Sequence, residues 1–262
     1  MTEWIALSRT RHTDSHFLPR QGYAFAADRQ VTPILLAELG KLLPHYPLGF
    51  VQQGDQFQPV ALLGLSGPNR YLHPDGRWMA DYVPAGLRGY PFTLANAEDN
   101  QQVLCIDHDH IQEEPNDSVS EALFDDEGSL SQRVQQTLDF LQQCESNRQL
   151  TIRACQTLGE LGLIEPWPLQ IGRGEDQTPL QVQGLFRINE KALNALEPTA
   201  FADLRKHGAL ALAYAQLFSL NQLHQLIERE KFHARQQPAQ SPNGNLDSLF
   251  GEDDDLSFDF GD

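Results

Sequence analysis

Basic residues are scarce in this chain of 262 residues, which has 19 Lys and Arg against 36 Asp and Glu and a formal net charge of −17. Affinity for nucleic acid and for anionic lipid depends on clustered Lys and Arg that neutralise phosphate groups. The composition therefore argues against a nucleic-acid-binding protein and against a protein that docks on a membrane surface.

Long hydrophobic runs and paired cysteines are also missing. The most apolar stretch, residues 209–220, is too short to cross a bilayer, and the first residues contain no apolar run of signal-peptide length. Cys105, Cys144 and Cys155 form an odd set without CxxC spacing, which indicates neither a disulfide framework nor a zinc site. We therefore expect a cytoplasmic protein with free thiols.

The acidic residues are concentrated in two segments. Residues 107–127 contain nine Asp and Glu and residues 236–262 contain seven, and neither segment contains Lys or Arg. Like charges repel and oppose compaction, so we expect both segments to be solvated appendages. The sequence thus predicts one folded domain over residues 1–235 and a disordered acidic linker and tail over residues 236–262.

Two kinds of pattern follow one another within residues 1–235. A helix is predicted at residues 33–43, with Thr32 as its N-cap and Pro33 at its first position. Short strand-like runs separated by turn residues come next, at residues 46–51, 60–65, 71–73, 92–94 and 103–106. Helical periodicity then predicts helices at residues 130–145, 148–160, 189–196, 199–206 and 209–230. We predict an α+β fold, with an antiparallel sheet from the N-terminal half packed against helices of the C-terminal half.

The run Asp107-His108-Asp109-His110 is the most metal-like cluster. In an extended chain His108 and His110 would face the same side, and a closed site would need a third ligand, such as His45 or His73. The alternative is a solvated strand end that enters an acidic loop. Catalysis by a nucleophile has weaker support, because the run from Gly64 lacks the second glycine of a nucleophile elbow.

Arginines and aromatic residues gather between residues 75 and 92, near Gly and Pro turns. Arg77, Trp78, Arg88 and Tyr90 could line a groove for a peptide or an acidic ligand, because Arg pairs with carboxylates and aromatic rings supply rigid contact area. The alternative is that the aromatic rings pack in the core while the arginines pair with nearby acids such as Asp81.

Apolar residues interleave with acids in the C-terminal segment, where Phe250, Leu256, Phe258 and Phe260 could be captured by a basic groove with apolar pockets. A segment that becomes ordered on binding suits modest, reversible affinity. Two alternatives stay open: a purely solubilising tail, or a tail that competes for an internal docking site with the similar run Leu123-Phe124-Asp125-Asp126-Glu127.

Several motifs along residues 34–227 resemble the SapC family of bacterial proteins. They include His45-Tyr-Pro-Leu-Gly-Phe, Tyr82-Val-Pro-Ala-Gly-Leu-Arg-Gly-Tyr-Pro-Phe and Leu185-Phe-Arg-Ile-Asn-Glu. The resemblance implies a mostly uncharacterised family named after a gene linked to a bacterial surface layer. Some members are encoded beside flavin-dependent tryptophan halogenases, cupin-like oxygenases and TonB-dependent receptors.

Together these observations favour a non-catalytic accessory protein of the cytoplasm that works without a cofactor. Its folded part would hold a peptide or protein through Arg77, Trp78, Arg88 and Tyr90, and its tail would recruit another protein, such as a halogenase or an oxygenase. The alternatives are a metal-dependent, oxygenase-like enzyme that uses His108 and His110, and a surface-layer-associated component.

Overall fold

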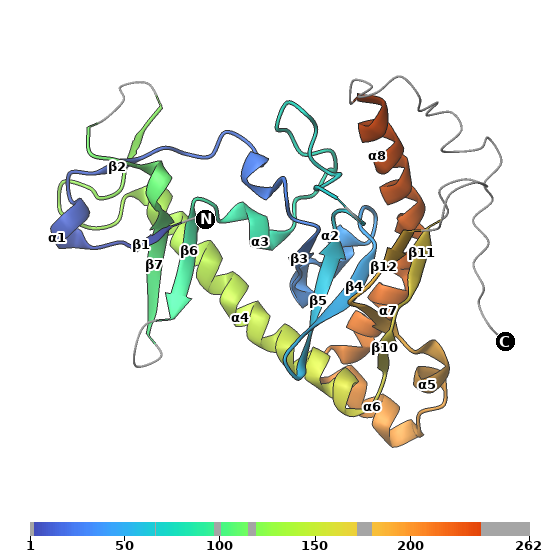
Figure 1. Cartoon of the computed structure of the whole chain (residues 1–262). Coiled ribbons are helices and arrows are strands. Elements are labelled where there is room, and N and C mark those ends of the chain that lie inside the picture. Colours follow the sequence, from blue (N-terminus) through green and yellow to red (C-terminus); the bar gives the residue numbers. More distant parts are fainter. Residues whose placement is uncertain (1–2, 66, 97–100, 115–118, 172–179, 237–262) are drawn as a thin grey trace.

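The computed structural model describes residues 3–65, 67–96, 101–114, 119–171 and 180–236 (Figure 1). The predicted tail, and with it Phe250, Leu256, Phe258 and Phe260, lies outside the described residues. Within them every strand pairing is antiparallel, and helices pack on the sheets. The predicted α+β fold is confirmed.

The largest sheet has five strands and draws on both halves of the chain. Its order is β10 (Ile164–Pro166), β13 (Leu185–Ile188), β4 (Leu48–Gln53), β5 (Gln56–Leu62) and β3 (Val31–Pro33). Strands β3, β4 and β5 come from the N-terminal half, as predicted, and β10 and β13 of the C-terminal half extend the sheet. Phe186 of β13 pairs with Phe50 of β4, and such long-range pairing leaves no mark in the local sequence.

Three smaller sheets complete the strand structure of the described residues. They are β1 (Trp4–Ala6), β7 (Gln102–Asp107) and β6 (Phe92–Asn96); β8 (Ile111–Gln112), β2 (His16–Phe17) and β9 (Glu121–Ala122); and β11 (Leu169–Ile171) with β12 (Leu180–Val182). In Figure 1 the first two lie together on the left, and the five-stranded sheet lies to their right.

Helix α4 (Gln132–Glu160) connects the two sides as one continuous helix of 29 residues, about 44 Å long. The predicted division into two helices at residues 145–148 is wrong, because this stretch contains no helix breaker and Arg148 pairs with Glu145 at 2.6 Å. Near its start α4 contributes Val134 to a small hydrophobic core around Phe17. Near its end it contributes Leu158 to the main core, which contains Phe50.

The remaining described helices are short. They are α1 (Arg9–His12), η1 (Ala24–Ala26), η2 (Leu36–Glu38), α2 (Leu39–Leu42), α3 (Ala85–Arg88), η4 (His108–His110), α5 (Glu190–Asn194), α6 (Pro198–Lys206), α7 (Ala209–Ser219), η5 (Leu220–Gln222) and α8 (Leu223–Gln236). Asn189 caps α5 by accepting a hydrogen bond from the backbone N–H of Ala192. The predicted helix at residues 209–230 is divided between α7 and α8 by η5.

The predicted helix at residues 33–43 begins later than expected. Thr32 and Pro33 belong to β3, where Thr32 pairs with Ala61 of β5. Helical structure starts at Leu36, and the carboxylate of Glu38 accepts a hydrogen bond from the backbone N–H of Leu35 at 2.9 Å. The N-cap prediction failed because an available neighbouring strand outweighed a local capping preference.

The first acidic segment is not the unfolded appendage that its charge predicts. The described part of residues 107–127 forms η4, β8 and β9, and the side chains of Leu123 and Phe124 are buried in the small core. Asp107, at the start of the segment, is itself only 3% exposed. Apolar anchors between the acids hold the segment in place, while most of the charges stay in water.

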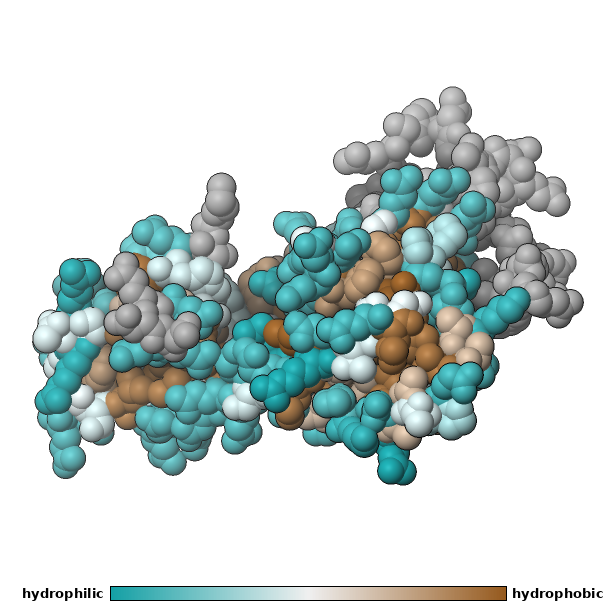
Figure 2. Space-filling model, turned by 90° about the horizontal axis from the view of Figure 1, so that it is seen from below, coloured by the Kyte–Doolittle hydropathy of each residue, from teal (hydrophilic) through white to brown (hydrophobic). Residues whose placement is uncertain are grey.

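Polar residues cover most of the lower face of the molecule (Figure 2). Hydrophobic residues gather there in separate groups, on the side of the β1-β7-β6 sheet and on the side of α5 to α7. Among the helices of the described residues, none is long and apolar enough to cross a membrane.

Candidate functional site

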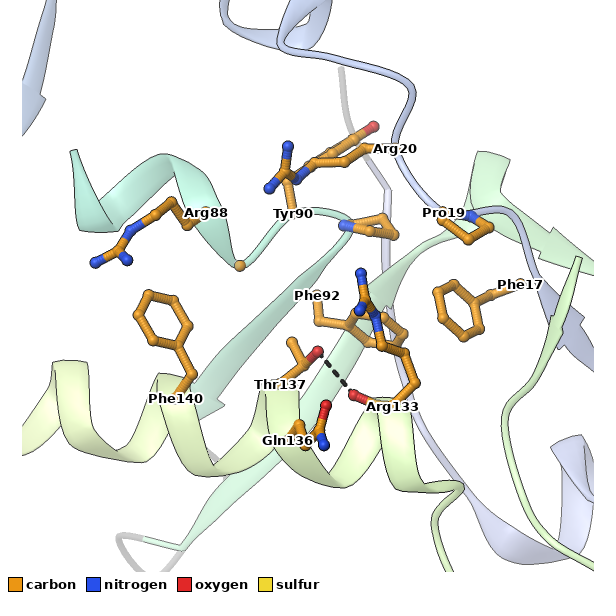
Figure 3. A pocket seen from close by; sticks show the side chains of 12 residues that line it. Phe17, Pro19, Arg20, Arg88, Tyr90, Phe92, Arg133, Gln136, Thr137 and Phe140 are labelled. Carbon is orange, nitrogen blue, oxygen red and sulfur yellow. Dashed lines mark hydrogen bonds between the residues drawn. The ribbon is translucent and has the colours of Figure 1, made fainter. Parts of the chain in front are cut away.

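An open cavity of about 380 Å³ lies where α4, the segment after β2 and the turn between α3 and β6 meet (Figure 3). Three arginines surround it, and we call it the arginine cavity. They are Arg20 after β2, Arg88 at the end of α3, and Arg133 in the first turn of α4. Aromatic and other side chains complete the lining, namely Phe17, Pro19, Tyr90, Pro91, Phe92, Gln136, Thr137 and Phe140, together with Gly89.

The charge of this lining is opposite to that of the protein as a whole. None of the described residues that line the cavity is acidic, and within the described chain none of the three arginines forms an ion pair. The guanidinium of Arg88 lies 4.7 Å from the ring centroid of Phe140. Guanidinium groups that form no ion pair and lie beside aromatic rings suit a ligand that combines a carboxylate with an aromatic group.

Arg88 is connected through Tyr82 to the buried carboxylate of Glu38, on the side away from the cavity lining. Its Nη2 donates a hydrogen bond to the hydroxyl of Tyr82 at 3.2 Å, and this hydroxyl donates to Oε2 of Glu38 at 2.9 Å. The backbone N–H of Ala85, in the first turn of α3, donates to the same oxygen at 2.8 Å. Burial raises the pKa of Glu38, although these hydrogen bonds and the charge of Arg88 act in the opposite direction.

Tyr90 is held on the other side of the cavity by the acidic segment. Its hydroxyl donates a hydrogen bond of 2.6 Å to the buried carboxylate of Asp107. Its ring stacks on Phe25 with a centroid distance of 4.0 Å and contacts the ring of His110 edge-on at 5.0 Å. Burial, followed by this hydrogen bond, raises the pKa of the Tyr90 hydroxyl.

His110 also anchors the segment that carries Arg20. Its Nδ1 donates a hydrogen bond to the carbonyl of Leu18 at 2.6 Å, and the N–H of Leu18 donates back to the carbonyl of His110 at 2.9 Å. These bonds fix the backbone two residues before Arg20. Two members of the metal-like run, Asp107 and His110, therefore support the cavity from outside its lining.

The extended conformation on which the metal hypothesis depends is absent, because His108–His110 form the 3-10 helix η4. His108 is exposed and lies 3.7 Å from Asp109, whereas His110 points toward Leu18. Across the described residues no group of three or more His, Cys, Asp or Glu could hold a metal ion. The structure thus brings no third ligand to His108 and His110.

Arg77 and Trp78 lie outside the arginine cavity. They line a second, more open hollow of about 450 Å³, together with His73, Met79, Ala80, Asp81 and Phe232. Arg77 pairs with Asp75 at 3.2 Å on an exposed turn, and the indole N–H of Trp78 donates to the hydroxyl of Tyr46 at 2.7 Å. The four predicted ligand-binding residues therefore divide into two sites.

A row of aromatic rings connects these two sites through a segment that the sequence analysis left unassigned. Tyr23 contacts Trp78 with a ring-centroid distance of 5.3 Å and Phe25 with one of 6.1 Å, and Phe25 stacks on Tyr90. Arg20 lies 4.3 Å above the ring of Tyr23. The N-terminal segment thus forms part of the site and couples Arg20 to the aromatic row.

Arg133 and Phe140 were also missed by the sequence analysis, although the sequence contains a signal for them. Residues 133, 136, 137 and 140 are Arg, Gln, Thr and Phe, and they follow helical spacing. They lie beside the apolar stripe of the same predicted helix, which consists of Leu130, Val134, Leu138 and Leu141. The stripe packs on the small core, and this neighbouring face borders the cavity (Figure 3). Arg20 gave no comparable signal, because it lies on an irregular segment.

Comparison with known proteins gives one family. A family model described as SapC matches residues 7–226, which is most of the chain and includes every described residue that lines the arginine cavity. No curated protein and no solved structure matches the chain. The match begins before residue 34, so it takes in the N-terminal segment with Phe17 and Arg20. The chain therefore belongs to the SapC family.

Proposed function

We propose that this protein is a non-catalytic accessory protein that binds an acidic, aromatic peptide segment of a partner protein in the arginine cavity. The observation that carries the proposal is a set of three arginines, beside aromatic rings, that form no ion pair within the described residues of a chain of net charge −17. Such a lining attracts carboxylates and provides flat apolar contact for a neighbouring aromatic side chain.

The chemistry of the lining supports binding and not catalysis. The described residues that line the cavity include no His, Cys, Lys, Asp or Glu that could act as a general acid, base or strong nucleophile, and the hydroxyl of the one tyrosine among them, Tyr90, donates its proton to Asp107. We place the protein in the cytoplasm, a reducing compartment that suits its three free cysteines. Our first choice of partner is a halogenase or an oxygenase of the kind encoded beside some family members.

Calorimetric titration with two short peptides tests this proposal. The first peptide alternates two aspartates with two phenylalanines and is blocked at both ends, and the second replaces each aspartate by asparagine. We expect the full chain to bind the acidic peptide at least about tenfold more tightly, because a charge-assisted hydrogen bond is worth about 1.5–3 kcal/mol.

Two arginine variants serve as test and matched control. Arg133→Gln should weaken binding of the acidic peptide about tenfold, because Arg133 borders the cavity and is exposed, so that its removal leaves the fold intact. Arg77→Gln removes the same charge in the second hollow and should leave the affinity unchanged. Equal affinities for both peptides, or a loss with Arg77→Gln alone, would refute the proposal.

A further inference from the structure

The C-terminal segment of this same chain has the chemistry that the cavity selects. Residues 255–260 read Asp-Leu-Ser-Phe-Asp-Phe, so that two phenylalanines flank one aspartate and a second aspartate lies three residues before Phe258. Residues 236–262 contain seven acidic and no basic residues. The cavity presents three arginines, and no acidic residue lines its described part.

An acidic segment of similar composition already packs on the aromatic residues of the small core. Leu123 is fully buried and Phe124 is 8% exposed, in the cluster that contains Phe17 and Phe92. The carboxylate of Asp125, the next residue, accepts hydrogen bonds from the backbone N–H groups of Glu127 and Ser129. A neighbouring arginine, Arg9, donates to the carbonyl of Glu127 at 3.3 Å.

Phe17 and Phe92 thus have two roles. They pack with Leu123 and Phe124 in the small core, and they also line the arginine cavity. Their rings lie edge to face with centroids 5.0 Å apart. The molecule therefore already contains one apolar-acidic run held beside this aromatic pair. The pair itself is covered, at 2% and 4% exposure, and the partly exposed aromatic rings of the cavity are those of Tyr90 and Phe140.

A long tether connects the segment to the last described helix. Helix α8 ends at Gln236, and 19 residues separate this residue from Leu256. Fully extended, they span about 65 Å, which exceeds the length of about 44 Å of α4, the longest helix of the described chain. In Figure 1 α8 and the β1-β7-β6 sheet lie at opposite sides of the molecule, so the tether must cross it.

We propose that residues 255–260 occupy the arginine cavity of their own chain and must be displaced before a partner can bind. The inference rests on the proposed function, because it names an occupant of the same site. A flexible tether whose length matches the span gives its segment an effective concentration of about 1 mM. If its own dissociation constant is about 0.1 mM, it weakens a competing peptide about tenfold.

Variants of the full chain test this inference by calorimetric titration with the acidic peptide described above. The double variant Phe258→Ala and Phe260→Ala should bind that peptide about tenfold more tightly than the natural chain, because its own segment no longer competes. The matched control Phe250→Ala makes the same substitution outside residues 255–260 and should bind like the natural chain. If the double variant also binds like the natural chain, the inference fails while the proposed function stands.

Amide signals of residues 256–260 in the ¹⁵N-labelled full chain provide a second readout that needs no added peptide. These signals should move when Arg133→Gln is introduced and stay unchanged with Arg77→Gln. Identical signals in the natural and Arg133→Gln chains would overturn the inference, even if the peptide still binds. A shift that depends on protein concentration would also overturn it, because the segment would then occupy the cavity of a second copy.

Discussion

The guanidinium of Arg88 donates a hydrogen bond of 3.2 Å to the hydroxyl of Tyr82. The Tyr82 hydroxyl can accept from Arg88 because its own proton is directed to Glu38, which is buried and accepts at 2.9 Å. A carboxylate that no ligand could touch thereby determines where a cavity arginine lies. The arrangement makes the affinity of the cavity dependent on a residue outside its lining.

Tyr82→Phe should separate this positioning from the charge of the cavity. The variant keeps Arg88 but leaves buried Glu38 with one hydrogen bond fewer, so we expect the free energy of unfolding to fall by about 1–3 kcal/mol. We also expect the affinity for the acidic peptide to fall severalfold, because Arg88 loses its fixed position. Urea denaturation and calorimetric titration measure the two effects.

The matched control is Tyr214→Phe on α7, where Tyr214 stacks on Phe218 far along the chain from the cavity residues. It removes the same hydroxyl group and should change neither stability nor affinity appreciably. An unchanged peptide affinity in Tyr82→Phe would contradict the positioning role of Tyr82.

The pH dependence of stability should report the buried carboxylate of Glu38. Its pKa is raised above 4.5 in the folded chain, so the folded state binds this proton more tightly than the unfolded state does. Stability contributed by this group is therefore present at low pH, and it is lost as the pH rises from about 4.5 through the raised pKa.

A comparison with Glu38→Gln isolates this group from all other carboxylates. We expect the unfolding free energy of the natural chain, relative to that of the variant, to fall as the pH rises above about 4.5. Denaturant titrations of both chains across this range measure the difference. A difference that is constant with pH would show that burial does not shift the titration of Glu38.

His110 and His108 should differ in their effect on stability. His110→Ala removes the hydrogen bond to Leu18 and the edge-on contact with Tyr90, so we expect the unfolding free energy to fall by about 1–2 kcal/mol. His108→Ala alters an exposed side chain and should change stability by less than about 0.5 kcal/mol.

Thermal unfolding of both histidine variants makes this comparison, with EDTA added in a parallel series. We expect EDTA to leave the melting temperature of the natural chain unchanged, because His110 spends its Nδ1 on a backbone carbonyl. Equal destabilisation by the two substitutions, together with a fall of the melting temperature in EDTA, would instead support a metal site.

Helix α4 should make the two hydrophobic cores unfold together. Leu158 is fully buried in the main core, so Leu158→Ala should lower the free energy of unfolding by about 2–5 kcal/mol. Because α4 also carries Val134 into the small core, we expect strand β7 to lose protection along with β4. Amide hydrogen exchange of both strands tests this, and loss of protection in β4 alone would indicate two independent units.

The periodicity of apolar residues predicted much of the fold, and it failed where distant segments decide. The helices after residue 130 were predicted because their apolar residues repeat at helical spacing within each segment. The cap of α5 was predicted because Asn189 is only three residues from Ala192, whose N–H donates a hydrogen bond to its side chain. The start of the first predicted helix was wrong, because Thr32 pairs with Ala61 in a strand. Residues 107–127 were predicted to be unfolded from their net charge. This prediction failed because a net charge does not show that two apolar residues, Leu123 and Phe124, pack in the small core.

Part of the candidate site could be found in the sequence and part could not. Arg88 and Tyr90 were identified because arginines and aromatic rings cluster near glycines and prolines in their segment. The helical spacing of Arg133 and Phe140 shows in the sequence that they share one face of a helix. It does not show that this face borders a cavity. Arg20 and Phe17 come from an N-terminal segment that only long-range contacts, such as the bonds between His110 and Leu18, bring to the cavity.

By itself the sequence determined the α+β class, the helical C-terminal half and the SapC membership, because these depend on local periodicity and on motifs that survive as strings of residues. Only the tertiary structure decided that three arginines, more than a hundred residues apart at the extremes, surround one cavity while Arg77 and Trp78 lie elsewhere. The physical reason is that charge and side-chain type are properties of single residues. Whether a guanidinium group pairs with an acidic residue depends on which residues lie next to it, and these neighbours are brought together only by folding.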